Sequence, residues 1–497
     1  MQVIDIVVFV VYFIAMLGVG FYFYFRNKST DDYYVGGRNM GAWHIGLSVV
    51  ATDVGGGFSI GLGGLGFIMG VSGSWMLLTG LVGAWISAVL LIPQVNRLSK
   101  KIPLLTFPQL FKYHYNGNVA LLAGLISGIG YIGFTSSQIL AGAKLASATF
   151  PVLTLNQALL IMGIIAVVYT VAGGLKAVIY TDTVQWIILM AGLIFIGIPL
   201  GYTAVGGFQG IREVLPNEFI RLDNITPVQF INWAITIIPI WFVGMTLYQR
   251  IYACRDEKTA KKAWFIAGLF EYPIMAFMGV LLGLFARVAA EQGQFAYMGY
   301  TDVATMDSEM GLPVLLRTVL PVGLTGLMLS AYFSAIMSTA DSCLMAASGN
   351  VVTDIFERIA PRLTKRNILR TSQITTLVIG ALALVLAMNM RNVLDLMLLS
   401  YAFMVSGLFV PVLGILFWKN SHPIAAFFSM LLGGATTTIL EITQYALPYG
   451  LDANVAGITV SLLVFVGLNL GLPPHEPSYS IDDSPGDENT VYDQVAR

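Results

Sequence analysis

Apolar runs long enough to cross a lipid bilayer occupy most of this 497-residue chain. A transmembrane helix needs about 20 apolar residues, and a spanning segment must satisfy its own backbone hydrogen bonds. We therefore expect an all-α membrane protein with about thirteen transmembrane helices. The thirteen runs are 3–25, 42–70, 74–94, 119–149, 155–172, 183–205, 229–250, 263–288, 311–345, 371–389, 394–417, 423–446 and 452–472.

The composition agrees with a membrane location, since 57% of the residues are hydrophobic, 11% are charged and the net charge is −1. A soluble domain carries about a quarter charged residues, so a cytosolic enzyme, a disordered chain and a basic nucleic-acid binder are excluded. Two cysteines and four scattered histidines offer neither a disulfide framework nor a metal cluster. We expect a multi-pass protein of the plasma (inner) membrane, with no enzyme activity, cofactor, nucleic acid or obligate protein partner.

The distribution of Lys and Arg sets the expected orientation. The first run has no basic residue before it and reaches Arg26 without a small-residue cleavage site, so it is read as a span and not as a signal peptide. Twenty Lys and Arg residues, Arg250 among them, fall on one side of the membrane and six on the other. Because cytoplasmic loops are enriched in positive charge, this split predicts an outside N-terminus, an inside C-terminus and an odd number of spans.

The connections between the runs are short, so residues 1–472 form one polytopic domain. The tail, 473–497, is acidic and almost without apolar residues. Segments of that composition cannot bury enough apolar surface to fold. We expect a disordered cytoplasmic tail.

Two spans contain helix-breaking residues. Gly55, Gly56 and Gly57 interrupt the second run, and Pro239 and Gly244 interrupt the seventh. Interrupted helices at matching positions in two halves indicate a transporter binding site. Because the two lie five spans apart, we predict two five-helix repeats in inverted orientation, at about 42–205 and 229–417, preceded by the span at 3–25 and followed by two spans at 423–472. The alternative is a pair of unrelated packing kinks.

Four carboxylates lie in or at the ends of the spans: Asp53, Asp182 at the start of the sixth, Glu271 and Asp341. Charges inside a bilayer are costly and are usually functional.

Hydroxyl groups gather in the ninth span within about one helical turn of Asp341, at Ser338, Thr339 and Ser342. Together with backbone carbonyls freed at a helix break, they offer the oxygen ligands of a hard cation. The alternative is that these hydroxyls bond to their own helix.

Four motifs identify a resemblance. They are Asp31-Asp32-Tyr33-Tyr34-Val35-Gly36-Gly37-Arg38, the segment 169–177, Tyr180-Thr181-Asp182-Thr183-Val184-Gln185, and Met337-Ser338-Thr339. In order and spacing the chain resembles the sodium:solute symporter family. The resemblance implies the five-plus-five inverted-repeat fold and sodium-driven alternating access. It also implies a main sodium site and, as in some members, a second one. Matching positions are Ala51, Val54, Ala335, Ser338 and Thr339 for the first site, and Asp182, Ser338, Asp341 and Ser342 for the second.

The resemblance also gives candidate solute contacts. Ala51-Thr52-Asp53-Val54 is similar to a segment of bacterial proline symporters, whereas Ala340-Asp341-Ser342 and the glycine triplet look like choline transporters. The latter have an aromatic residue where Asp53 stands, so a cation–π cage is not transferable. By position, the residues expected to face the solute are Asp53, Gly55, Gly56, Phe134, Gln138 and Trp241, although each aromatic side chain could equally belong to the core.

The sequence therefore predicts sodium-coupled import of a small organic solute, with an amino acid such as proline or an amine preferred. The alternative is a proton-coupled transporter that uses Asp53, Asp182 or Asp341 as the relay. An ion channel is disfavoured because no repeated filter sequence or charged pore ring is present.

Overall fold

The computed structural model describes residues 3–24, 35–53, 55–102, 104–150, 152–173, 175–359 and 368–476. Within these ranges the regular structure is helical, and a single bridge joins Met40 to Cys254. The longer helices are α1 (Val3–Tyr24), α3 (Ala42–Asp53), α4 (Gly55–Met69), α5 (Trp75–Leu90), α6 (Ile92–Lys101), α8 (Gly117–Thr149), α9 (Leu155–Gly173), α10 (Leu175–Gly192), α13 (Pro227–Val243), α14 (Met245–Ala253), α15 (Glu257–Leu269), α16 (Ala276–Glu291), α18 (Leu324–Gly349), α21 (Ile368–Ala387), α22 (Val393–Phe417), α23 (Pro423–Thr443) and α24 (Ala453–Gly471).

Shorter elements connect or extend these helices. They are α7 (Pro108–His114), α11 (Ile198–Ala204), α12 (Gly207–Val214), α17 (Gly311–Val319), α19 (Glu357–Ile359) and three π-helical turns at Leu193–Gly197, Phe270–Met275 and Asn350–Phe356.

The structure is that of a multi-pass membrane protein. By length and composition, nine helical stretches in the described part of the chain can cross a membrane, and the bent pair α13–α14 makes ten. The predicted all-α fold is therefore confirmed. The count of thirteen spans, the inversion of the two repeats and the N-out orientation stay predictions, and most of the acidic tail lies outside the described residues.

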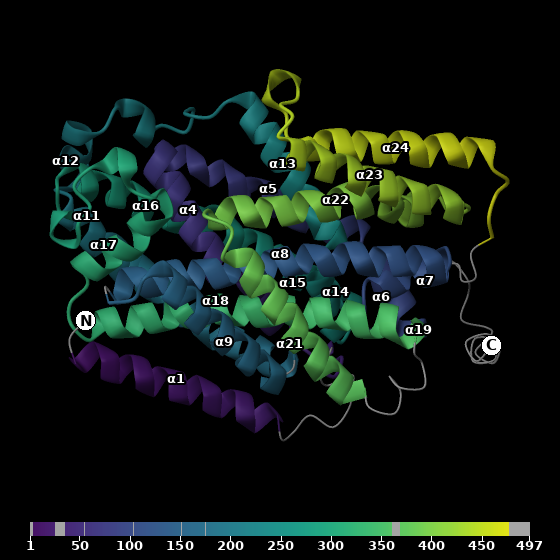
Figure 1. The fold of residues 1–497 in the computed structure, drawn as a ribbon, viewed down its shortest axis with the longest axis horizontal. Coiled ribbons are helices and arrows are strands. Elements are labelled where there is room, and N and C mark those ends of the chain that lie inside the picture. The colour runs from purple at the N-terminus through teal and green to yellow at the C-terminus, as the bar shows by residue number, and fades with distance from the viewer. Residues whose placement is uncertain are drawn as a thin grey trace.

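Three long helices form the centre of the molecule. Figure 1 shows α8, α18 and α22 side by side, and α8 packs against both of the others. On one edge α1 lies against α18, and on the opposite edge α23 and α24 pack on α22. The helix α3 contacts α10, α14 and α18, and α18 also contacts α10 and α14. Polar side chains between these helices, such as those of Ser48, Asp182 and Arg250, are buried.

Both predicted interruptions separate two helices. The first is marked by Gly55, the first residue of α4, whose φ is +44°; α3 ends at Asp53, and residue 54 lies outside the described residues. The second is at Gly244, whose extended backbone bends α13 and α14 by 43°. Pro239 lies inside α13, so the glycine and not the proline ends that helix.

Small residues allow two helices to approach closely next to the first interruption. A Cβ atom added at Gly66 of α4 would lie 2.2 Å from the carbonyl oxygen of Val280, and one at Gly283 of α16 would lie 2.0 Å from that of Gly63. Backbone-to-backbone packing of this kind is typical of helices in membranes. This packing fixes the position of α4, the helix that follows the first interruption, against α16.

The structure corrects two boundaries. The run 311–345 is not one span, because α17 ends at Val319 and α18 begins at Leu324, after Gly323 with φ +86°. The sixth run begins at 183, but helical structure already covers Leu175–Gly192 in α10, so Asp182 lies inside the helix and is buried. At the first boundary, the positive φ of Gly323 separates the two helices although the run is apolar throughout.

Candidate functional site: the helix break and two buried polar clusters

The predicted main sodium site is partly assembled around Thr339. Its hydroxyl donates to the carbonyl oxygen of Ala51 at 3.0 Å and to that of Ala335 at 3.1 Å. Ala51 lies in the last described turn of α3, and carbonyls in the last turn of a helix commonly bond to groups outside the helix. Three oxygens, from Ala51, Ala335 and Thr339, therefore meet at one point. Val54 lies outside the described residues.

Gly55 packs directly against the Thr339 side chain. A Cβ atom there would lie 2.5 Å from the Thr339 hydroxyl oxygen, and the positive φ of Gly55 disfavours any L side chain. The glycine thus allows the start of α4 to lie directly against α18. Gly56 follows it in the first turn of α4.

Ser338, the fifth residue of the predicted main site, makes a different contact. Its hydroxyl donates to Asp182, and so does the hydroxyl of Ser48, at 2.5 Å. A buried carboxylate needs such partners to offset its desolvation. Ser338 therefore belongs to a cluster around Asp182 and is separated from Thr339, although the two residues are adjacent in sequence.

Arg250 completes the Asp182 cluster. Its side chain is fully buried, and one guanidinium nitrogen lies 3.6 Å from Asp182 Oδ2. The same nitrogen donates to Thr52 at 2.7 Å and to Ser342 at 2.9 Å. The charge distribution counts Arg250 among the residues on one side of the membrane, at the end of the seventh run, and it lies buried in the last turn of α14. The only sequence signal for a buried role was its place shortly after the broken helix.

Asp341 is separated from this cluster. It accepts a hydrogen bond from Thr170 of α9, while its second carboxyl oxygen has no hydrogen-bond partner among the described residues. Its neighbour Ser342 instead faces Arg250 and lies 3.5 Å from the Thr52 hydroxyl. Of the four residues predicted for a second sodium site, Asp182, Ser338 and Ser342 therefore belong to the cluster around Arg250, and Asp341 contacts α9 instead.

A second polar cluster surrounds Asp53 at the end of α3. Tyr401 of α22 donates its hydroxyl to Asp53 at 3.3 Å, and Phe134 of α8 packs edge-on against the Tyr401 ring, with centroids 5.1 Å apart. The carboxyl of Glu271 interacts with that of Asp53. Glu271 was recognisable in the sequence as an intramembrane carboxylate, whereas nothing in the sequence pointed to Tyr401.

Glu271 is unusual because it is 0% exposed and interacts with another acid, Asp53, while no amine, amide or hydroxyl donor among the described residues reaches its carboxyl oxygens. It lies in the π-helical turn between α15 and α16. A buried carboxyl that has another acid beside it and no other donor is costly. Such a group is therefore a candidate for ligand binding.

The remaining predicted solute contacts lie in two places. Gln138 lies against Gly57, since a Cβ atom added at Gly57 would be 2.4 Å from Gln138 Oε1, which has no hydrogen-bond partner among the described residues. Trp241 instead packs against Gly83 of α5 and edge-on against Trp264. Gln138 therefore lies at the broken helix, and Trp241 lies in the packing between α13, α5 and α15.

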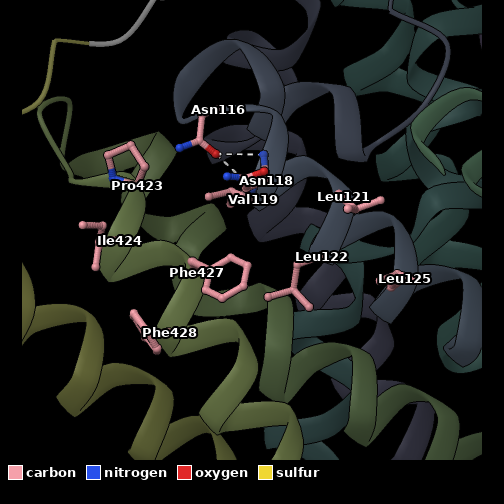
Figure 2. A pocket seen from close by; sticks show the side chains of 10 residues that line it. All are labelled: Asn116, Asn118, Val119, Leu121, Leu122, Leu125, Pro423, Ile424, Phe427 and Phe428. Carbon is pink, nitrogen blue, oxygen red and sulfur yellow. Dashed lines mark hydrogen bonds between the residues drawn. The ribbon is translucent and has the colours of Figure 1, made fainter. Parts of the chain in front are cut away.

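A separate groove of about 500 Å³ lies between the start of α8 and the start of α23. Figure 2 shows that apolar side chains of both helices line it, with Asn116 and Asn118 at one end. None of its lining residues belongs to the polar clusters described above. The groove is not the candidate solute site.

Two bacterial proline transporters are similar to this chain over most of their length. The chain is 28% identical over 467 residues to the osmoregulated proline transporter OpuE of Bacillus subtilis, covering 91% of this chain and 92% of that protein. It is 29% identical over 437 residues to the high-affinity proline transporter PutP of the same organism, covering 85% and 89%.

A solved structure of a Na⁺-coupled sialic acid symporter in a substrate-bound outward-open state superposes with a TM-score of 0.77. At 21% identity it covers 96% of this chain and 99% of that one, so the two share a fold. The model of the sodium:solute symporter family matches residues 33–433. With a match over most of its length, the chain belongs to the sodium:solute symporter family.

Proposed function

We propose that this protein is a sodium-coupled symporter that imports a small organic solute across the plasma (inner) membrane by alternating access. The observation that carries the proposal is the contact of the Thr339 hydroxyl with the Ala51 and Ala335 carbonyls, at 3.0 and 3.1 Å. It brings three hard oxygen ligands together at the end of a broken helix, where transporters of this kind bind their coupling ion.

A sodium ion at this point would hold the end of α3 against α18. Because Gly55 and Gly56 follow directly, holding that end would also fix the backbone that faces the solute. Ion and solute would then strengthen each other's binding, which is positive linkage. Moving one charge inward through 100 mV releases about 2.3 kcal/mol, and this energy drives accumulation of the solute.

We place the solute beside Asp53, Gln138 and Phe134. Asp53 and Glu271 provide two neighbouring carboxyl groups, and Tyr401 and Phe134 provide aromatic surface. Carboxyl groups in a buried site favour a positively charged nitrogen over an anion. An amino acid such as proline or an amine fits this site, in agreement with the proline transporters among the relatives.

The proposal is tested with purified protein in detergent. Sodium should raise the melting temperature relative to potassium or N-methylglucamine at equal ionic strength, because a ligand that binds the native state stabilises it by about 2.7 kcal/mol at a hundred times its Kd. Thr339→Ala should abolish the sodium-specific rise, and Thr339→Ser, which keeps the hydroxyl, should retain it. A wild-type protein that responds equally to all three cations would contradict sodium coupling.

The second candidate function is proton-coupled transport. It is favoured by the two interacting carboxyls of Asp53 and Glu271 and by the unpartnered oxygen of Asp341. Proteoliposomes distinguish the two functions. A proton-coupled transporter would accumulate proline under a pH gradient without sodium, and a sodium-coupled one would require a sodium gradient.

A further inference from the structure

The groove between α8 and α23 lies on the outer surface of the helix bundle. Three residues of its walls, Leu125, Ile424 and Phe428, are 42%, 46% and 44% exposed. Both helices are long and apolar enough to cross a membrane, and exposed apolar patches mark contacts with lipid or with another protein. The volume of about 500 Å³ is within the usual range of about 300–1,000 Å³ for ligand sites. The walls therefore suit the hydrocarbon chains of a lipid.

One end of the groove is polar. Asn116 accepts hydrogen bonds from the backbone N–H groups of Asn118 and Val119 at 2.9 and 3.0 Å, and so caps α8. Because the carboxamide oxygen makes these bonds, the carboxamide nitrogen points away from the helix, as Figure 2 shows. From Asn116 to Leu125 the helix rises by about 13 Å. The groove thus has a donor at the start of the span and apolar walls along it, which matches the head and chains of a phospholipid.

Arg358 adds a positive charge at the polar end. It lies in α19, and its exposed guanidinium donates to the carbonyl oxygen of Gly117 and to Asn118 Oδ1, the latter at 2.5 Å. These hydrogen bonds use two of the five donors of a guanidinium. Arginine binds phosphate groups through paired hydrogen bonds. The other donors of Arg358 therefore suit a phosphate at this end of the groove.

The charge distribution favours an anionic lipid. Lys112 of α7 precedes α8 and Lys419 precedes α23, and both belong with Arg358 to the twenty Lys and Arg residues predicted to lie on the cytoplasmic side. The cytoplasmic leaflet has a negative surface potential because of its anionic lipids. A zwitterionic headgroup brings its own cation, which Arg358 would repel. A headgroup with a net negative charge fits this end better.

We propose that the groove between α8 and α23 binds one phospholipid with an anionic headgroup. Its acyl chains lie along the apolar walls, and its phosphate lies between Arg358 and the carboxamide nitrogen of Asn116. The bound lipid connects the central helix α8 to α23. The groove shares no residue with the candidate ion and solute sites, so this inference does not depend on sodium coupling.

Native mass spectrometry of the purified full-length protein, titrated with dioleoylphosphatidylglycerol or dioleoylphosphatidylcholine, tests the proposal. Wild type should retain one phospholipid per chain. It should bind phosphatidylglycerol about fivefold more tightly than phosphatidylcholine, the factor expected from one cation near an anionic lipid. Arg358→Met should remove this preference. Leu122→Trp, which fills the groove with an indole ring, should retain neither lipid.

Each variant has a matched control. Lys258→Met removes another exposed cation, in α15, which packs on α3 and α5. Leu160→Trp enlarges a leucine of α9 that is 45% exposed and lies outside the groove. Both controls should bind the two lipids as wild type does.

Equal affinity of wild type for the two lipids, or retention of phosphatidylglycerol by Leu122→Trp, would overturn the inference. A wild-type dimer that Leu122→Trp dissociates would also overturn it, because a second copy of the chain would then cover the groove. If Leu122→Trp does not fold, the headgroup preferences of wild type and Arg358→Met still decide.

Discussion

At the scale of single residues, two buried glutamates have opposite surroundings. Glu309 accepts hydrogen bonds from Lys144 Nζ at 2.7 Å and from the backbone nitrogens of Val393 and Leu394 at 2.8 and 2.9 Å. Glu271 has no such donor among the described residues, and its carboxyl lies beside that of another acid, Asp53. We therefore expect Glu309 to stabilise the fold and Glu271 to destabilise it.

This contrast predicts opposite effects of the same substitution. Glu271→Met should raise the free energy of unfolding by about 1–3 kcal/mol, because it removes a buried acid that has another acid beside it and no other donor, and should lower sodium-dependent uptake. Glu309→Met should lower the free energy of unfolding by about 3–5 kcal/mol, because it leaves a buried cation short of a partner. Denaturation and uptake measured on both variants check the prediction. A loss of stability in Glu271→Met would mean that Glu271 serves packing.

At the scale of helices, the approach of α4 to α16 depends on glycine. Gly283→Ala places a methyl group 2.0 Å from the Gly63 carbonyl oxygen, so the two helices must separate at a cost of about 1–3 kcal/mol. The same substitution at Gly18 of α1, which has nothing within 4 Å of the added atom, should leave stability nearly unchanged. Melting temperatures of the two variants measure the difference, and equal values would show that the α4–α16 contact is loose.

The capping residue at the start of α15 is expected to make the stability of the protein depend on pH. Asp256 caps this helix by accepting the Thr259 backbone N–H at 2.7 Å, and this hydrogen bond lowers the pKa of Asp256 below its ordinary value of 3.8. A carboxyl whose pKa is lowered on folding contributes stability above its unfolded pKa and loses it as the pH falls through the folded pKa.

Asp256→Asn keeps a capping oxygen and removes the titration, so its melting temperature should fall less between pH 6 and pH 3 than that of the wild type. Asp256→Ala removes the cap and should cost about 1 kcal/mol at pH 7. Identical pH profiles for wild type and Asp256→Asn would contradict this account of the cap.

At the scale of the whole molecule, Lys144 joins parts that are distant in sequence. It lies near the end of α8 and contacts Asp307 at 2.6 Å and Glu309 at 2.7 Å, while Glu309 also binds the start of α22. Lys144→Met should lower the free energy of unfolding by about 3–5 kcal/mol, yet leave the sodium-specific thermal shift in place. Combined with Glu309→Met it should cost less than the sum of the single effects, because the two residues interact. Additive losses would show that they act independently.

Much of the architecture follows from hydrophobicity and from helix-breaking residues. The apolar runs predicted an all-helical membrane protein because a bilayer leaves the backbone few alternatives. The glycines at 55–57 and at 244 marked the interruptions because their backbone preference is local. Four linked motifs identified the family. The Thr339 hydroxyl lies against the Ala51 and Ala335 carbonyls, while the sodium site that the resemblance implies there stays a prediction.

Only the tertiary structure decided which side chains face one another. Ser338 and Thr339 are adjacent, but successive residues of a helix point about 100° apart, so one contacts Asp182 and the other the helix break. Arg250, Tyr401 and Glu271 reach the clusters from separate helices, and the charge pattern indicated only on which side of the membrane Arg250 lies. Sequence determines which segments enter the membrane, because that depends on each segment alone. The partners of a buried charge depend on how all the helices pack.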